Sequence, residues 1–204
     1  MMLASEWFMP LKIAPQTNVL EAHLETDRLT LEPLLPDHAS ILLADLQDHR
    51  LYQYIPQDPP KNLQVLSDRF KTLRKRFSPK GDQVWLNWAV RLKANAQYVG
   101  LLQATVNQDH SSSIAYFIFS AWQQRGYCKE SLRHVISFLF EHLEVTSVLA
   151  EIDTRNCLSI NVVQGLGFEK VGFKADADFF KGGSSSEYRY CLKRNRWNSL
   201  CQID

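Results

Sequence analysis

The sequence has little glycine, proline and cysteine, and almost no net charge. Its 204 residues include 8 Gly, 8 Pro and 4 Cys, and the formal net charge is +1 at pH 7. Because 45% of the residues are hydrophobic and glycine and proline are scarce, the composition is that of a globular protein rather than a disordered or repetitive chain. A charge near zero gives no general attraction for nucleic acid or an anionic membrane. The length suits one substantial core, so we expect a single folded domain.

Long apolar runs and metal-ligand patterns are also missing. No stretch reaches the roughly 18 apolar residues of a membrane helix. The segment from Met1 to Leu20 is interrupted by Glu6 and Pro10 and does not resemble a signal peptide. The six histidines form no HExxH or similar set, so we expect no metal. These absences predict a cytoplasmic protein with neither a nucleic-acid nor a membrane partner, and they leave open whether it is a monomer or a homodimer.

The cysteines are widely and irregularly spaced. They are Cys128, Cys157, Cys191 and Cys201. Without a CxxC pair, neither a zinc ribbon nor a compact disulfide framework is indicated, and a reducing compartment is the simpler interpretation.

Hydrophobic periodicity predicts alternating blocks of strands and helices. Residues 1–24 show no sustained periodicity and are expected to be an N-terminal extension that packs on the domain or stays mobile, with a single domain at 25–204. Strands are predicted at 28–34, 84–92, 98–107, 113–119, 148–152, 168–173 and 187–192, and helices at 39–46, 63–77, 129–143 and 157–164. The order β-α-α-β-β-β-α-β-α-β-β is a mixed α/β (α+β) fold rather than a doubly wound one. The absence of GxGxxG and GxxxxGK[ST] argues against dinucleotide and P-loop sites.

The segment from Trp122 to Ser131 is the most informative part of the chain. It follows a predicted strand, forms a compact polar loop, and precedes an amphipathic helix. The first-turn N–H groups and the positive end of the helix dipole favour a phosphate at such a junction. Because Gly126 has no Cβ, an anion can approach the backbone closely. The pattern predicts a phosphorylated cofactor.

Three motifs occur in order along the chain. Thr26-Asp27-Arg28-Leu29-Thr30-Leu31 forms the opening strand, Gln123-Gln124-Arg125-Gly126-Tyr127-Cys128 fits [Q/R]-x-x-G-x-[G/A] except at Cys128, and Asn156-Cys157-Leu158-Ser159 precedes Leu166-Gly167-Phe168. Together they resemble the Gcn5-related N-acetyltransferase (GNAT) superfamily. The similarity covers roughly residues 25–193 and is greatest to the branch of bacterial ribosomal-protein N-terminal acetyltransferases.

The resemblance implies a mostly antiparallel, splayed central sheet that holds acetyl-CoA between two diverging strands. Backbone N–H groups of the loop would bind the pyrophosphate, and the strand ending near Phe119 would pair with pantetheine. Asn156 would hydrogen-bond pantetheine, and Ser159 would face the thiol. The predicted acetyl-CoA-binding residues are Phe119, Gln123, Gln124, Arg125, Gly126, Tyr127, Cys128, Lys129, Asn156 and Ser159.

The catalytic groups implied by the resemblance are less distinct. The family's thiolate-protonating tyrosine corresponds to Val163, so Ser159 is the predicted substitute. A backbone N–H between Phe117 and Ser120 would polarise the thioester carbonyl. Glu187 is the predicted base or amine-orienting carboxylate, with Glu32 second and a water chain as the alternative to both.

These residues also have plainer interpretations. Gly126 alone would suit a turn, Asn156 an N-cap, Glu187 a surface carboxylate, and Cys128 a small space-filler rather than a nucleophile.

The resemblance implies an acetyl-CoA-dependent acyltransferase that acts by direct transfer to a primary amine in a ternary complex. An α-amine has a pKa of about 8 and a lysine about 10.4. Since no strong base is visible, a protein N-terminal α-amine is the first expected acceptor. Two alternatives remain, a small-molecule amine acetyltransferase and a non-catalytic acyl-CoA-binding or regulatory module; the valine at position 163 favours the latter.

Overall fold

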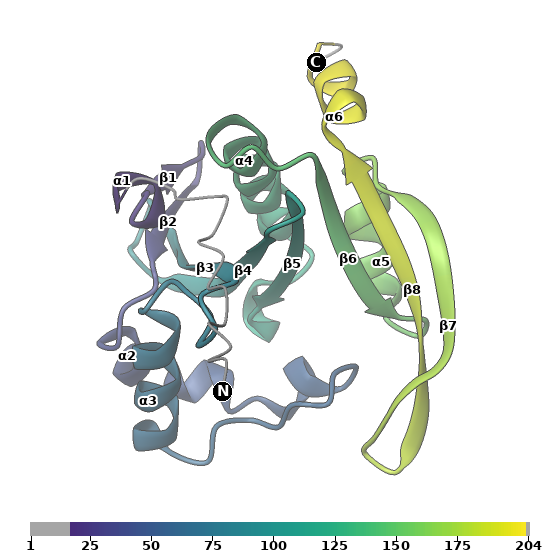
Figure 1. The fold of residues 1–204 in the computed structure, drawn as a ribbon. Helices are drawn as coiled ribbons and strands as arrows, with labels where there is room; N and C mark the ends of the chain where they lie inside the picture. The colour runs from purple at the N-terminus through teal and green to yellow at the C-terminus, as the bar shows by residue number, and fades with distance from the viewer. Residues whose placement is uncertain (1–16, 203–204) are drawn as a thin grey trace, which may run out of the picture.

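The structure, a computed structural model, describes residues 17–202 (Figure 1). Its strands are β1 (Leu24–Glu25), β2 (Leu29–Pro33), β3 (Gln83–Leu92), β4 (Tyr98–Asn107), β5 (Ser111–Ile118), β6 (Ser147–Asp153), β7 (Glu169–Phe180) and β8 (Gly183–Lys193). Its α-helices are α1 (Thr17–Leu20), α2 (His38–Leu46), α3 (Leu63–Leu73), α4 (Tyr127–His142), α5 (Cys157–Gln164) and α6 (Arg194–Cys201). Two 3-10 turns, η1 (His49–Tyr52) and η2 (Ser120–Trp122), complete the described part.

All eight strands form one sheet in the order β1-β2-β3-β4-β5-β6-β8-β7. Neighbouring strands are antiparallel except β5 and β6, which are parallel. That parallel contact is short, since only Ser111–Ser113 pair with Ser147–Leu149. Beyond it the two strands diverge, as Figure 1 shows, and the sheet splits into an N-terminal and a C-terminal half. The mixed α/β fold with a mostly antiparallel, splayed sheet is confirmed.

Helices cover both faces of the N-terminal half. The apolar side of α4, including Leu132 and Ile136, packs with Val90 and Leu102 in the larger core cluster. On the opposite face, Phe70 of α3 belongs to a second cluster with Ala89, Leu101 and Phe119. Because both faces are covered, β3 is almost continuously buried rather than alternating between buried and exposed residues. The long β7, in contrast, is mostly exposed.

The predicted order of elements is confirmed, but several boundaries differ. The helix predicted at 63–77 ends at Leu73, because Arg76 has φ +62° and Phe77 forms an isolated bridge to Val84. The strands β7 and β8 are longer than predicted, since their exposed residues carry little apolar alternation. The short α1 and β1 and the C-terminal α6 were not predicted.

Residues 17–24 of the predicted extension pack on the domain. Val19, Leu20 and Ala22 contact the larger core cluster, and Leu24 pairs with Leu31 in the sheet. The rest of that extension, residues 1–16, lies outside the described residues. Within residues 17–202 no helix has the length and apolar content needed to cross a membrane.

Candidate active site

A pocket of about 630 Å³ lies where β5 and β6 diverge. One wall is the end of β5, from Tyr116 to Ile118, and another is the first turn of α5. The loop before α4 closes one end, and a further side is lined by Arg50, Leu51, Gln53 and Tyr54. The pocket therefore joins two of the three sequence motifs and the end of a predicted strand with a segment that no motif indicated.

The loop before α4 has the backbone of an anion site. Gln124 and Gly126 both have left-handed conformations, with φ +60° and +82°, and Gly126 is the N-cap residue of α4. Successive turns of this kind direct consecutive N–H groups to one side, where the helix N-terminus adds positive potential. The Gln123 side chain fixes the loop by donating from Nε2 to the Ile118 carbonyl at 2.9 Å.

Gly126 is required for its conformation more than for space. A Cβ placed there would lie 3.3 Å from Nη2 of Arg28. Its φ of +82° is strained for residues with side chains, above all β-branched ones.

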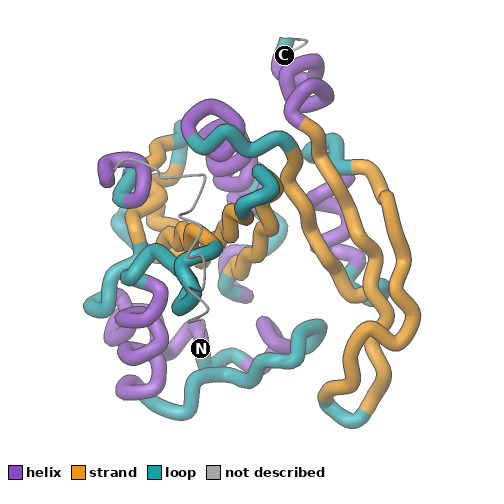
Figure 2. Tube along the Cα trace, in the orientation of Figure 1, coloured by secondary structure: helices purple, strands orange, loops and turns teal. Residues whose placement is uncertain are grey.

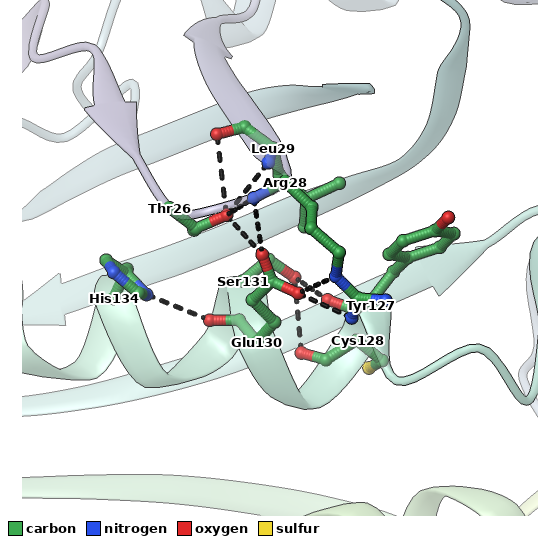
Figure 3. Close-up of polar contacts among 8 residues, drawn as sticks. All are labelled: Thr26, Arg28, Leu29, Tyr127, Cys128, Glu130, Ser131 and His134. Carbon is green, nitrogen blue, oxygen red and sulfur yellow. Dashed lines mark hydrogen bonds and ion pairs between the residues drawn. The ribbon is translucent and has the colours of Figure 1, made fainter. Parts of the chain in front are cut away.

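The first turn of α4 is locked to the start of β2 (Figure 3). Glu130 accepts from the Arg28 Nε at 2.6 Å, from its backbone N–H at 3.1 Å, and from the Thr26 hydroxyl. Burial raises the pKa of Glu130, but these hydrogen bonds outweigh it and leave the pKa below its ordinary value. The Arg28 guanidinium also lies 4.6 Å from the Tyr127 ring centroid. The opening-strand motif thus holds the predicted acetyl-CoA loop in place.

The diverging edge of β5 presents backbone groups toward the pocket. Phe119 N–H donates to the Val99 carbonyl at 2.9 Å, so the odd-numbered residues at this end of β5 face β4. The N–H and C=O of Ile118 therefore face away from β4, toward the pocket. Within the predicted range Phe117 to Ser120, the Ile118 N–H is the group placed to meet a carbonyl oxygen.

Phe119 itself lies outside the pocket. Its side chain is 1% exposed and belongs to the second core cluster, and its N–H is committed to Val99. Arg125 is also absent from the pocket wall, because its guanidinium stacks 4.9 Å from the Trp122 ring centroid. The other predicted acetyl-CoA-binding residues all line the pocket, namely Gln123, Gln124, Gly126, Tyr127, Cys128, Lys129, Asn156 and Ser159.

The N-terminus of α5 brings a hydroxyl to the same pocket. Asn156 caps the helix, as predicted, by accepting from the Ser159 N–H at 3.1 Å. The Ser159 Oγ has no hydrogen-bond partner in the described part of the chain. Val163 is completely buried in the core, so it offers no polar group to the site.

Tyr116 was missed by the sequence reasoning. Nothing in its strand distinguishes it from a core aromatic, yet its hydroxyl donates to the Ser159 carbonyl at 3.3 Å inside the pocket wall. Burial raises the pKa of Tyr116 well above its ordinary value. Burial also raises the pKa of the Cys128 thiol to about 12, so this cysteine stays protonated and is no nucleophile.

Glu187 lies on β8, directly opposite Asp153 of β6, and does not line the pocket. Burial, followed by the nearby Glu151 carboxylate, raises the pKa of Glu187. Its carboxylate has no hydrogen-bond or ion-pair partner among residues 17–202. Asp153, in contrast, is bound by Arg155 and Ser185, and the Arg155 hydrogen bonds lower its pKa to about 2.

Glu32, the second predicted base, is engaged elsewhere. It accepts from Arg91 at 2.5 Å and from the Tyr98 hydroxyl at 2.7 Å, and it lies outside the pocket. Its position in this network supports a structural role.

The sequence matches a known protein family. A family model described as the acetyltransferase (GNAT) domain matches residues 28–169, most of the chain. The uncharacterized N-acetyltransferase YoaA of Bacillus subtilis is 21% identical over 151 residues, 73% of this chain and 84% of that protein.

Solved structures share the fold. A candidate ribosomal-protein-serine acetyltransferase from Vibrio cholerae has a TM-score of 0.70 at 22% identity, covering 85% of this chain and 98% of its own. The spermidine N-acetyltransferase from Vibrio cholerae, solved with CoA and spermine, has a TM-score of 0.72 at 14% identity, with 83% and 98% covered.

Proposed function

Because the chain belongs to the acetyltransferase (GNAT) family, we propose that this N-acetyltransferase takes its acetyl group from acetyl-CoA and transfers it directly to the α-amine of a protein N-terminus. One observation carries the proposal. A loop with two left-handed residues and a helix N-terminus opens into a pocket that continues along the unpaired edge of β5.

The described residues fit acetyl-CoA along the length of this pocket. The N–H groups around Gly126 suit a pyrophosphate, since they converge at the N-terminus of a 16-residue helix. The backbone N–H and C=O of Tyr116 also face away from β4 and suit the amides of pantetheine, which can pair with a strand edge. Asn156 and Ser159 lie on the opposite wall, where the thioester would come.

Three groups have separate tasks in the transfer. The Ile118 N–H donates to the carbonyl oxygen of the thioester as the amine nitrogen bonds to the carbonyl carbon. The Ser159 hydroxyl donates a hydrogen bond to the sulfur as the carbon–sulfur bond breaks, and the departing thiolate then takes a proton from solvent water. Glu187, acting through a water, accepts the proton that the amine gives up. The products are an N-acetyl amide and free CoA thiol.

The site favours an amine that loses its proton easily. Glu187 does not line the pocket and acts only indirectly, through a water. The acceptor amine must therefore lose its proton with little assistance from the protein. An α-amine, with a pKa of about 8, meets this condition better than a lysine at about 10.4.

A polyamine is the second candidate acceptor. Glu187 lies near Asp178, Glu151 and Asp153. Arg189 and Arg155 pair with Glu151 and Asp153, so Glu187 and Asp178 are the carboxylates that can attract a cationic amine. The fold shared with a spermidine acetyltransferase agrees with this candidate.

Thiol release from acetyl-CoA tests the proposal most cheaply. Peptides with free N-termini, the same peptides with blocked N-termini, and polyamines would be compared at one pH. We expect release with free N-termini and little with blocked ones. Acetyl-CoA binding without release for any amine would instead indicate the non-catalytic module.

We also propose a domain organisation and a cellular location for this protein. We treat residues 25–204 as one catalytic domain. Since the four cysteines are unpaired, a reducing cytoplasm is the expected location.

A further inference from the structure

Residues 48–58, between α2 and α3, cross the open end of the divided sheet, and we refer to them as the strap. Figure 2 shows the strap leaving α2 and running toward the β7–β8 hairpin. Four of its residues, Arg50, Leu51, Gln53 and Tyr54, line the pocket. The strap is therefore part of the pocket wall and not a remote surface loop.

The strap is anchored to the N-terminal half of the sheet at its start. Ser120, just after β5, donates from Oγ to the Asp48 carboxylate at 2.5 Å. The Tyr52 ring of the strap lies 5.5 Å from that of Phe117 on β5, and within the strap Arg50 binds the Asp48 carboxylate at 2.8 Å. These contacts fix the strap beside the strand that faces the pocket.

Its other end is anchored to the C-terminal half. Lys181, at the turn between β7 and β8, donates from Nζ to the carbonyls of Ile55 at 2.8 Å and Gln57 at 3.1 Å. The same ammonium lies 3.7 Å from the Asp58 carboxylate.

These contacts close a ring around the open end of the sheet. β5 and β6 are joined at one end by their three-residue parallel contact, and the strap joins the two halves at the other. Most of the ring is covalent chain or sheet, which opens only with unfolding. The Lys181 contacts join exposed loops, so they are the weakest link.

We propose that the contacts of Lys181 with the strap, which we call the clasp, narrow the opening through which the acceptor amine reaches the pocket. A free N-terminus then enters the pocket more readily than an internal lysine, whose backbone continues on both sides. This inference rests on the proposed function. A chain terminus brings one segment to the ring, whereas an internal lysine brings two. Releasing the strap from the hairpin widens the entrance without touching the acetyl-CoA loop.

A competition between two peptides tests the clasp. One peptide has a free N-terminus and no lysine, and the other has a blocked N-terminus and one internal lysine. Mass spectrometry gives the ratio of internal to terminal acetylation for each enzyme. Because every enzyme sees the same peptides at the same pH, differences in amine pKa cancel between enzymes.

Lys181→Met should raise this ratio roughly tenfold and leave the KM for acetyl-CoA unchanged. Lys181→Arg retains donors for the two carbonyls and should preserve the wild-type ratio. The matched control is Lys193→Met, an exposed lysine at the other end of β8, which should also preserve it. Hydrogen exchange at residues 53–58 should accelerate only in Lys181→Met, which reports the release of the strap independently of activity.

An unchanged ratio in active Lys181→Met with faster exchange would overturn the inference, because the strap would be free without consequence for acceptors. Unchanged exchange would also overturn it, because Lys181 would then not hold the strap. If no enzyme acetylated either peptide while thiol release occurred with a small amine, the proposed protein acceptor would be wrong and this inference would fall with it.

Discussion

The two ends of the pocket are built in different ways. The end proposed to bind acetyl-CoA is lined by residues of two short continuous segments, Gln123–Lys129 and Asn156–Ser159, and its loop contains two left-handed residues. The proposed acceptor end is lined by the strap and the end of β5, and the β7–β8 turn holds the strap from outside the pocket, so these parts are far apart in the sequence. A backbone site formed by one continuous segment can be recognised from a short sequence motif. A site assembled from distant segments cannot, because the fold determines which side chains meet there.

The largest effect should come from removing the hydroxyl at the junction of the two ends. Ser159→Ala should lower kcat by roughly 100-fold or more, because the departing sulfur loses its donor, while the acetyl-CoA Kd stays within about twofold. Single-turnover kinetics and calorimetry measure the two quantities.

Tyr116→Phe is the matched comparison, since it deletes the other hydroxyl of the pocket wall and keeps the ring. We expect a smaller loss of kcat than in Ser159→Ala. If Tyr116→Phe lowered kcat more and Ser159→Ala had a near-normal kcat, Tyr116 would be the hydrogen-bond donor to the departing sulfur.

Valine substitutions at two glycines with positive φ test whether the loop before α4 binds acetyl-CoA. Gly126→Val should weaken acetyl-CoA binding roughly 50-fold, because a β-branched residue does not tolerate a φ of +82° and the loop N–H groups lose alignment. Gly182→Val, at φ +79° in the hairpin turn, has equal strain far from the loop. Calorimetry should show normal acetyl-CoA affinity in that control. An equal loss of affinity in both variants would contradict the assignment of the loop as the phosphate-binding site.

Asn156 allows capping and binding to be distinguished. Asn156→Asp keeps an oxygen for the Ser159 N–H and should retain stability, whereas Asn156→Ala should lose about 1 kcal/mol of unfolding free energy. Both variants lack the amide NH₂ group, so both should bind acetyl-CoA roughly tenfold more weakly. If Asn156→Asp binds normally, the residue is a cap and nothing more.

The sequence predicted the order of the central elements because buried strands and amphipathic helices carry strong periodicity. It predicted too long an α3, since Phe77 continues the helical spacing while packing from a bridge outside the helix. The strap and Lys181 carry no local signal in the sequence, because the contacts of Lys181 with the strap join residues more than 120 positions apart. Phe119 was assigned to the ligand from its position in the strand, but its side chain faces the second core cluster.

The smallest effects concern pH at the acceptor end. Because burial and Glu151 raise the pKa of Glu187, the acidic limb of kcat/KM should lie above the ordinary glutamate range. Glu151→Gln removes a like charge, lowers the pKa of Glu187, and should shift this limb to lower pH by a few tenths of a unit. Glu187→Gln should shift it upward, toward the α-amine pKa of about 8. Shifts in the same direction for both variants would exclude Glu187 as the base.

The most direct test of the account is the position of the acetyl group on a peptide that carries both a free N-terminus and an internal lysine. Tandem mass spectrometry after reaction with the wild-type protein and acetyl-CoA identifies the modified nitrogen. We predict acetylation of the α-amine. Predominant acetylation of the lysine, or transfer to polyamines alone, would contradict the proposed acceptor.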